Sequence, residues 1–165
     1  MPVRLEGSCR CGAISFSVDS HTPYPYQRCY CSICRKTAGG GGYAINIMGE
    51  TATLKVRGSR NIAVYRARVI EEGAKRPTLS KGRRHFCAKC ASALWAWDPR
   101  WKDWVYPFAS AIDTPLPKPP EDVEMMLDYA VPWADIPKGR GHQHFDEYPE
   151  ESIADWHRKR LLEVP

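Results

Sequence analysis

The sequence contains no apolar run of about 20 residues, the length that a membrane-spanning helix needs, so we expect no membrane association. Residues 1–6 include no apolar stretch of the signal-peptide kind, and we therefore expect a cytoplasmic protein with reduced thiols. No phosphate-binding loop, internal repeat or low-complexity segment is present, which leaves no ground for a nucleotide site or a repeat array. The 24 basic residues are dispersed, and a net charge of +5 does not by itself indicate a nucleic-acid partner.

Length and composition predict one domain, residues 1–165, with a mainly β fold. The chain is long enough for a hydrophobic core, and its 14 prolines and 12 glycines favour a turn-rich β protein over a helical bundle. Alternation of apolar and polar residues predicts half-buried strands at 13–18 and 43–48. Further strands are expected at 51–56, 62–66, 94–97, 104–108 and 123–129, with a turn at 49–50, an exposed loop at 139–144 and a short helix at 149–162.

None of the seven cysteines stands alone in the sequence. Three of them lie within six residues, as Cys29, Cys31 and Cys34. The other four form two close pairs, Cys9 with Cys11 and Cys87 with Cys90. Thiolates bind Zn²⁺ at about 2.3 Å, and three of them leave one position of a tetrahedron free, which is the ligand count of a catalytic zinc site.

Disulfides, iron–sulfur clusters and unligated core thiols fit this grouping less well than zinc does. Disulfides would leave one thiol over and would need an oxidising compartment. Four thiolates could also hold an iron–sulfur cluster, but ligand pairs on short turns suit zinc at least as well. Isolated core cysteines would not be grouped in this way.

Spacing alone does not assign the ligands. A zinc ribbon would join Cys31 and Cys34 to Cys87 and Cys90, and would leave the remaining three thiols unused. Joining Cys9 and Cys11 to Cys87 and Cys90 instead uses every thiol, because the middle three then form a local set of their own. We prefer this second arrangement, which predicts two zinc sites.

Three motifs in order resemble the glutathione-dependent formaldehyde-activating enzyme family, which also includes the centromere protein V branch. They are Gly7-Ser8-Cys9-Arg10-Cys11-Gly12, then Cys29-Tyr30-Cys31-Ser32-Ile33-Cys34-Arg35-Lys36, then Arg84-His85-Phe86-Cys87-Ala88-Lys89-Cys90. The resemblance covers about residues 7–135 and leaves 136–165 as a carboxyl-terminal extension. It implies packed antiparallel sheets of the β-tent type. It also implies a structural zinc on Cys9, Cys11, Cys87 and Cys90, and a catalytic zinc on Cys29, Cys31 and Cys34.

The activity implied by the resemblance is that of a carbon–sulfur lyase of the S-(hydroxymethyl)glutathione synthase type, which joins formaldehyde to glutathione, or that of an enzyme acting on a related thiol adduct. A zinc ion with an open position could bind a thiol or polarise a carbonyl. Glutathione carries two carboxylates, so Arg28, Arg35 and Lys36 are candidates to bind it as a substrate. A homodimer is compatible with the sequence.

The alternative is a zinc module that binds a partner without catalysis, as the centromere-protein branch suggests. Its motivation is the positive charge and the basic segments Arg83-Arg84 and Arg158-Lys159-Arg160. The histidines His21, His142 and His144 are expected in loops and outside the metal sites, because the cysteine sets already satisfy the ligand count.

Overall fold

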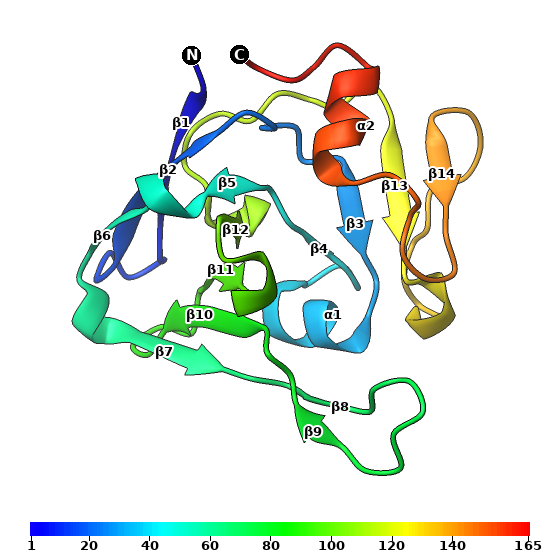
Figure 1. Cartoon of the computed structure of the whole chain (residues 1–165), viewed down its shortest axis with the longest axis horizontal. Helices are drawn as coiled ribbons and strands as arrows, with labels where there is room; N and C mark the ends of the chain where they lie inside the picture. Colours follow the sequence, from blue (N-terminus) through cyan, green and yellow to red (C-terminus); the bar gives the residue numbers. More distant parts are fainter.

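Three β-sheets and one small hairpin form the framework of the protein, and the computed structural model describes residues 1–165 (Figure 1). The first sheet has the order β1-β2-β6 and the second the order β5-β12-β11-β10-β7, and both are antiparallel. Their strands are β1 (Val3–Ser8), β2 (Ser15–Ser20), β5 (Gly49–Glu50), β6 (Lys55–Arg57), β7 (Ile62–Tyr65), β10 (Arg83–Cys87), β11 (Ala93–Trp97) and β12 (Trp104–Pro107).

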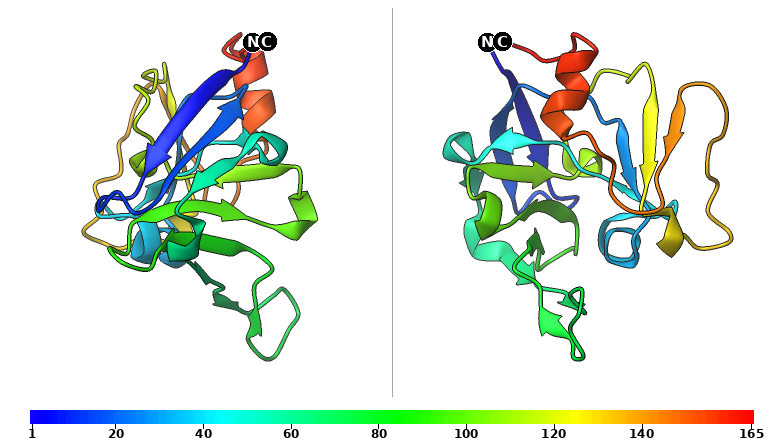
Figure 2. Two further views of the ribbon diagram at one scale, coloured as in Figure 1. Left: turned by 90° about the vertical axis from the view of Figure 1, so that its left-hand side faces the viewer. Right: turned by 45° about the vertical axis from the view of Figure 1, so that its right-hand side comes forward.

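The third sheet, in the order β14-β13-β3-β4, has mixed strand directions. Strand β13 pairs in parallel with both β14 and β3, whereas β3 and β4 are antiparallel. Its strands are β3 (Gln27–Cys29), β4 (Ala44–Ile45), β13 (Asp122–Met125) and β14 (His142–His144). The hairpin of β8 (Arg68–Val69) and β9 (Thr78–Leu79) projects away from the sheets in both views of Figure 2.

Two short α-helices flank the third sheet. Helix α1 (Ser32–Ala38) follows β3 directly, and α2 (Ile153–Lys159) lies near the end of the chain. Ser152 caps α2, since its hydroxyl accepts a hydrogen bond from the Asp155 N–H at 3.1 Å. Single 3₁₀ turns occur at Thr51–Thr53, Ser59–Asn61, Pro99–Trp101, Ala109–Ala111 and Leu127–Tyr129. None of the helices has the length and apolar composition needed to cross a bilayer.

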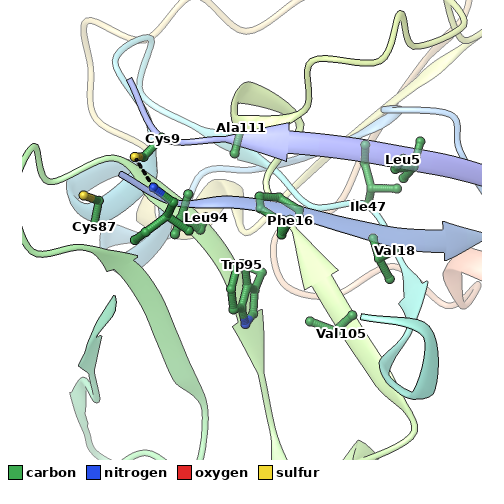
Figure 3. Close-up of a cluster of buried hydrophobic side chains, with 11 residues drawn as sticks. Leu5, Cys9, Phe16, Val18, Ile47, Cys87, Leu94, Trp95, Val105 and Ala111 are labelled. Carbon is green, nitrogen blue, oxygen red and sulfur yellow. Dashed lines mark hydrogen bonds between the residues drawn. The ribbon is translucent and has the colours of Figure 1, made fainter. Parts of the chain in front are cut away.

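The larger hydrophobic core joins the first two sheets (Figure 3). Phe16 of β2 meets Trp95 of β11 edge to face, with ring centroids 5.1 Å apart. The buried members are Leu5, Cys9, Ile14, Phe16, Val18, Ile47, Cys87, Leu94, Trp95, Val105 and Ala111. Burial of one large apolar side chain contributes about 1.5–3 kcal/mol. This core therefore holds the second sheet against the first, and Cys9 and Cys87 lie together at its end.

A second core supports the third sheet and includes the carboxyl-terminal helix. Tyr26, just before β3, stacks on Trp156 of α2, with ring centroids 3.7 Å apart and planes 8° from parallel. The buried members are Tyr26, Cys29, Cys34, Ala44, Phe108, Val123, Met125 and Trp156. Cys29 and Cys34 are therefore core residues, and Trp156 of α2 belongs to the same buried cluster.

The structure confirms the mainly β fold with several antiparallel sheets and a carboxyl-terminal helix. Several local predictions were wrong. The strand expected at 51–56 begins as the 3₁₀ turn Thr51–Thr53, and only β6 follows it as a strand. Gly49 and Glu50 form strand β5, because they pair with β12, and are not a turn. The strand expected at 123–129 ends at Met125, because Met126 adopts a left-handed conformation with φ of 60°. Residues 142–144 are not loop but strand β14, which extends the third sheet beside β13 (Figure 1).

Candidate metal centres

Four cysteines from two distant segments meet at the end of the larger core. Cys9 and Cys11 belong to the turn between β1 and β2, whereas Cys87 ends β10 and Cys90 lies in the turn that follows. The Sγ of Cys11 lies 3.6 Å from that of Cys9 and 3.8 Å from that of Cys87. Tetrahedral geometry with Zn–S bonds of about 2.3 Å puts sulfurs about 3.8 Å apart. The set therefore has the donors and the spacing of a closed zinc site.

Hydrogen bonds fix the two turns that carry these thiols. The N–H of Ile14 donates to Cys9 Sγ at 3.2 Å, so a backbone dipole already faces this sulfur. The Ser92 hydroxyl lies 3.2 Å from Cys90 Sγ and, together with the Ser92 backbone, lowers the pKa of the Cys90 thiol to about 5. The same hydroxyl accepts a bond from the Arg10 N–H at 3.0 Å, which ties the two turns together. This arrangement favours the thiolate of Cys90, the form that binds metal, whereas hydrogen bonding to Cys90 helps to raise the pKa of the neighbouring Cys11 thiol to about 11.

The other three cysteines form a separate cluster where β3 passes into α1. Cys29 ends β3, Cys31 is the N-cap of α1, and Cys34 lies in the first turn of that helix. The Cys34 N–H donates to Cys31 Sγ at 3.3 Å, so the thiol takes the place of the usual capping oxygen. The three Sγ atoms lie within 4.8 Å of one another, with Cys29 and Cys34 buried and Cys31 partly exposed. The local chain path alone therefore assembles this cluster.

The three thiols of this cluster, Cys29, Cys31 and Cys34 (the trio), differ in pKa. Cys29 first, and then Cys34, lower the pKa of the Cys31 thiol by hydrogen bonding to its thiolate. The pKa of Cys29 is raised, chiefly because it serves as donor to Cys31. Cys31, the most accessible of the three, is thus the first to ionise, and a bound cation would favour ionisation of the other two.

Arg84 is the residue at this cluster that sequence reasoning did not find. Its Nη2 donates to Cys34 Sγ at 3.4 Å and its Nη1 donates to Thr37 Oγ1 at 3.2 Å. The guanidinium also lies 5.8 Å from the centre of the Phe108 ring. Arg84 and Cys34 are 50 residues apart in the chain, and no local pattern shows that β10 runs beside α1. The only available signal was its place in the motif that leads into Cys87.

The three predicted glutathione anchors lie in different surroundings. Arg28 of β3 is engaged, since its Nη2 lies 3.4 Å from Asp122 Oδ2 and its Nη1 lies 3.6 Å from Glu124 Oε1. Lys36 on α1 is exposed, and Arg35 beside it is half-buried, with an Nε that has no hydrogen-bond partner. Only the two residues on α1 therefore present cations without an acidic partner.

Two separate cysteine clusters that could each hold a metal ion, on a small β scaffold, define the class of protein, and the comparisons identify its family. A model of the family described as "Glutathione-dependent formaldehyde-activating enzyme" matches residues 4–124. A protein of Halomonas elongata described as a "Putative glutathione-dependent formaldehyde-activating enzyme" is 54% identical over 159 residues, which cover 96% of this chain and 98% of that protein. The chain therefore belongs to the glutathione-dependent formaldehyde-activating enzyme family.

Comparison with solved structures also shows a similar fold. The crystal structure of a Rhodobacter sphaeroides protein matches with a TM-score of 0.50 and 22% sequence identity, and the match covers 68% of this chain and 91% of that one. At this level of identity the likeness concerns the fold alone. The resemblance identified from the cysteine motifs is thus confirmed at the level of the family.

Proposed function

We propose that the protein is a zinc-dependent carbon–sulfur lyase of the S-(hydroxymethyl)glutathione synthase type, with Cys29, Cys31 and Cys34 as ligands of the catalytic zinc. The observation that carries the proposal is the partition of seven thiols into a set of four and a set of three at separate places. Four thiolates complete a tetrahedron, as a structural site requires, and we assign Cys9, Cys11, Cys87 and Cys90 that role. Three thiolates leave room for a substrate.

The proposed reaction is an addition without redox change. The sulfur of the thiol forms a bond to the formaldehyde carbon, the carbonyl π bond breaks, and the proton lost from sulfur ends on the new hydroxyl. A zinc ion bound by the trio would lower the pKa of a substrate thiol or polarise the carbonyl. The protein's part is to hold both reactants at the half-exposed side of the trio, which turns a bimolecular encounter into a local one.

The positive groups around the trio divide into two roles. Arg84 donates to Cys34 Sγ and so stabilises the negative charge of the thiolates. Arg35 and Lys36, on the helix that carries Cys34, are placed to bind the carboxylates of glutathione. Arg28, which we expected as a third anchor, already faces Asp122 and Glu124, so we assign it the smaller share of substrate binding.

The remaining expectations support the same proposal. Ligand sets made only of thiols need a reducing compartment, which favours the cytoplasm. The stacking of Trp156 on Tyr26 joins the carboxyl-terminal extension to the core and supports a single domain over residues 1–165. The homodimer stays a prediction.

The non-enzymatic alternative loses much of its motivation. Arg84 contacts the trio, and Arg83 lies over the Trp97 ring, 5.3 Å from its centre. The second basic segment is ion-paired, with Arg158 at 2.7 Å from Asp155, Lys159 at 2.7 Å from Glu151, and Arg160 beside Glu121. These two segments therefore do not present a free basic patch of the kind that nucleic acid needs.

Exchange spectroscopy by NMR tests the proposed activity. We expect the zinc-loaded protein to accelerate the exchange between free glutathione and its formaldehyde adduct. The control is the same mixture with the protein after metal removal, which should exchange at the uncatalysed rate. The absence of acceleration at any zinc loading would contradict the formaldehyde form of the proposal.

Replacement of Arg84 by glutamine should weaken metal binding at the trio alone. The loss of a hydrogen bond to a metal ligand typically costs 10–100-fold in affinity or activity, and we expect an effect of about that size. Chelator competition on the variant would measure it. Arg83→Gln is the matched control, because Arg83 is exposed and has no contact with a thiol in the structure. Equal losses in the two variants would show that general charge, and not the bond to Cys34, is responsible.

A further inference from the structure

A third group of potential metal ligands lies on the mixed sheet, outside both cysteine clusters. It consists of Asp122, Glu124 and His142, whose ligand atoms lie within 4.8 Å of one another. The parallel register pairs Asp122 with His142, so side chains of β13 and β14 converge on one face of the sheet. Figure 1 shows the two strands side by side. The register between β13 and β3 adds Arg28 opposite Glu124.

The carboxylate of Glu124 is buried and lacks hydrogen-bond partners. Its side chain is 0% exposed, and neither of its oxygens has a hydrogen-bond partner. Burial raises the pKa of this carboxyl group, as expected for a charge removed from water. The Nδ1 of His142 is also buried and without a partner, and it lies 3.5 Å from Glu124 Oε1. Native proteins rarely leave such polar atoms unsatisfied, so the two Glu124 oxygens and His142 Nδ1 indicate a missing ligand.

An ion pair with Arg28 does not account for the arrangement. Hydrogen bonds between a guanidinium and a carboxylate are typically about 2.7–2.9 Å long. Arg28 Nη2 lies 3.4 Å from Asp122 Oδ2, and Arg28 Nη1 lies 3.6 Å from Glu124 Oε1 without a hydrogen bond. One guanidinium also leaves one of the two carboxylate charges unbalanced when the imidazole is neutral. The ligand atoms of Asp122, Glu124 and His142 lie within 4.8 Å of one another without a hydrogen bond between them.

The spacing fits a tetrahedral metal. Oxygen and nitrogen ligands at about 2.0–2.1 Å from Zn²⁺ lie about 3.4 Å from each other. The His142 Nδ1 lies 3.5 Å from Glu124 Oε1 and 3.7 Å from Asp122 Oδ2. His144 is oriented differently, because its Nε2 lies 2.6 Å from the Pro137 carbonyl and 3.9 Å from Glu124 Oε2.

We propose that Asp122, Glu124 and His142 form a third metal site that takes a divalent transition-metal ion of the Zn²⁺ or Co²⁺ type. Two carboxylates and one imidazole are hard and borderline donors, which suit such ions better than they suit Ca²⁺ or Cu⁺. The ion would join β14, which lies beyond the residues matched by the family model, to β13. The site does not depend on the lyase activity.

Cobalt titration of the protein with its cysteine clusters preloaded with zinc tests the site. We expect one equivalent of Co²⁺ to bind with visible d–d absorption and without a thiolate-to-cobalt charge-transfer band. Glu124→Gln and His142→Gln should each weaken this binding by about a hundredfold or more, since each removes a ligand. His21→Gln is the matched control, because His21 also faces a carboxylate, that of Glu50 at 3.2 Å, but lies outside the three-ligand group.

Each outcome decides the proposal. Binding that is lost in His142→Gln and kept in His21→Gln supports it, and a cobalt-dependent rise in melting temperature that follows the same pattern adds to that support. No cobalt binding by the unchanged protein overturns it, and so does binding that both ligand variants retain. A charge-transfer band would place the cobalt in a cysteine cluster and would also overturn it. If Glu124→Gln fails to fold, His142→Gln still decides, because its side chain is 26% exposed and lies on an edge strand.

Discussion

Cys87→Ser should prevent stable folding. Cys87 is 0% exposed, belongs to the larger core and, in our assignment, completes the closed four-thiolate set. Zinc binding to sites of this kind supplies about 10–16 kcal/mol in small zinc peptides, whereas whole domains are stable by about 5–15 kcal/mol. Loss of one ligand therefore removes a contribution as large as the net stability. Thermal unfolding followed by circular dichroism, with zinc present, would measure the loss.

Ala88→Ser is the matched control for this experiment. It introduces the same hydroxyl in the same turn, but Ala88 is exposed and has no thiol. We expect a melting transition close to that of the unchanged protein, and a chelator should destabilise both proteins toward the state of Cys87→Ser. A cooperative, unshifted transition in Cys87→Ser would show that the four cysteines do not clamp the fold.

Cys31→Ser should abolish catalysis and leave the fold intact. Serine is a good N-cap, so its hydroxyl can accept the bond from the Cys34 N–H that Cys31 Sγ accepts now. The zinc ligand, however, is lost. Lewis-acid stabilisation is worth several kcal/mol, and about 3 kcal/mol corresponds to a loss of roughly a hundredfold in rate. The glutathione–formaldehyde exchange rate, measured beside the melting temperature, separates the two effects.

Ser32→Ala serves as the control, because Ser32 is exposed and adjoins Cys31 without being a ligand. Its exchange rate should equal that of the unchanged protein. Full activity in Cys31→Ser would indicate a two-metal scaffold whose three-thiolate site is vestigial, and the lyase proposal would then be wrong. The contrast with Cys87→Ser is the central point, since one substitution should affect stability and the other only chemistry.

Short-range sequence patterns predicted much of this molecule. The grouping of Cys29, Cys31 and Cys34 is visible in the sequence because a strand end and one helical turn suffice to bring them together. Alternation and aromatic clusters located β2, β11 and β12 to within about two residues. A carboxyl-terminal helix was predicted, but its bounds were not: it was expected at 149–162, whereas α2 begins at Ile153 after the cap Ser152 and ends at Lys159.

Long-range pairing could not be predicted in the same way. A three-residue strand such as β3 does not specify whether its neighbour runs parallel or antiparallel, so its parallel pairing with β13 was not anticipated. For the same reason His142 was expected in a loop, and nothing local shows that it faces Asp122 and Glu124. In the sequence, Arg84 was assigned to a basic segment that could bind nucleic acid. Its contact with Cys34 could not be predicted, because only the tertiary structure brings β10 beside α1.

The position of Trp156 has a consequence for comparisons within the family. The family model ends at residue 124, yet the buried cluster that includes Cys29 and Cys34 is completed by an indole supplied more than 30 residues later. Relatives with unrelated tails must fill that space with other side chains. Tail exchange between relatives would therefore change the buried cluster that includes Cys29 and Cys34 without altering any of the shared motifs.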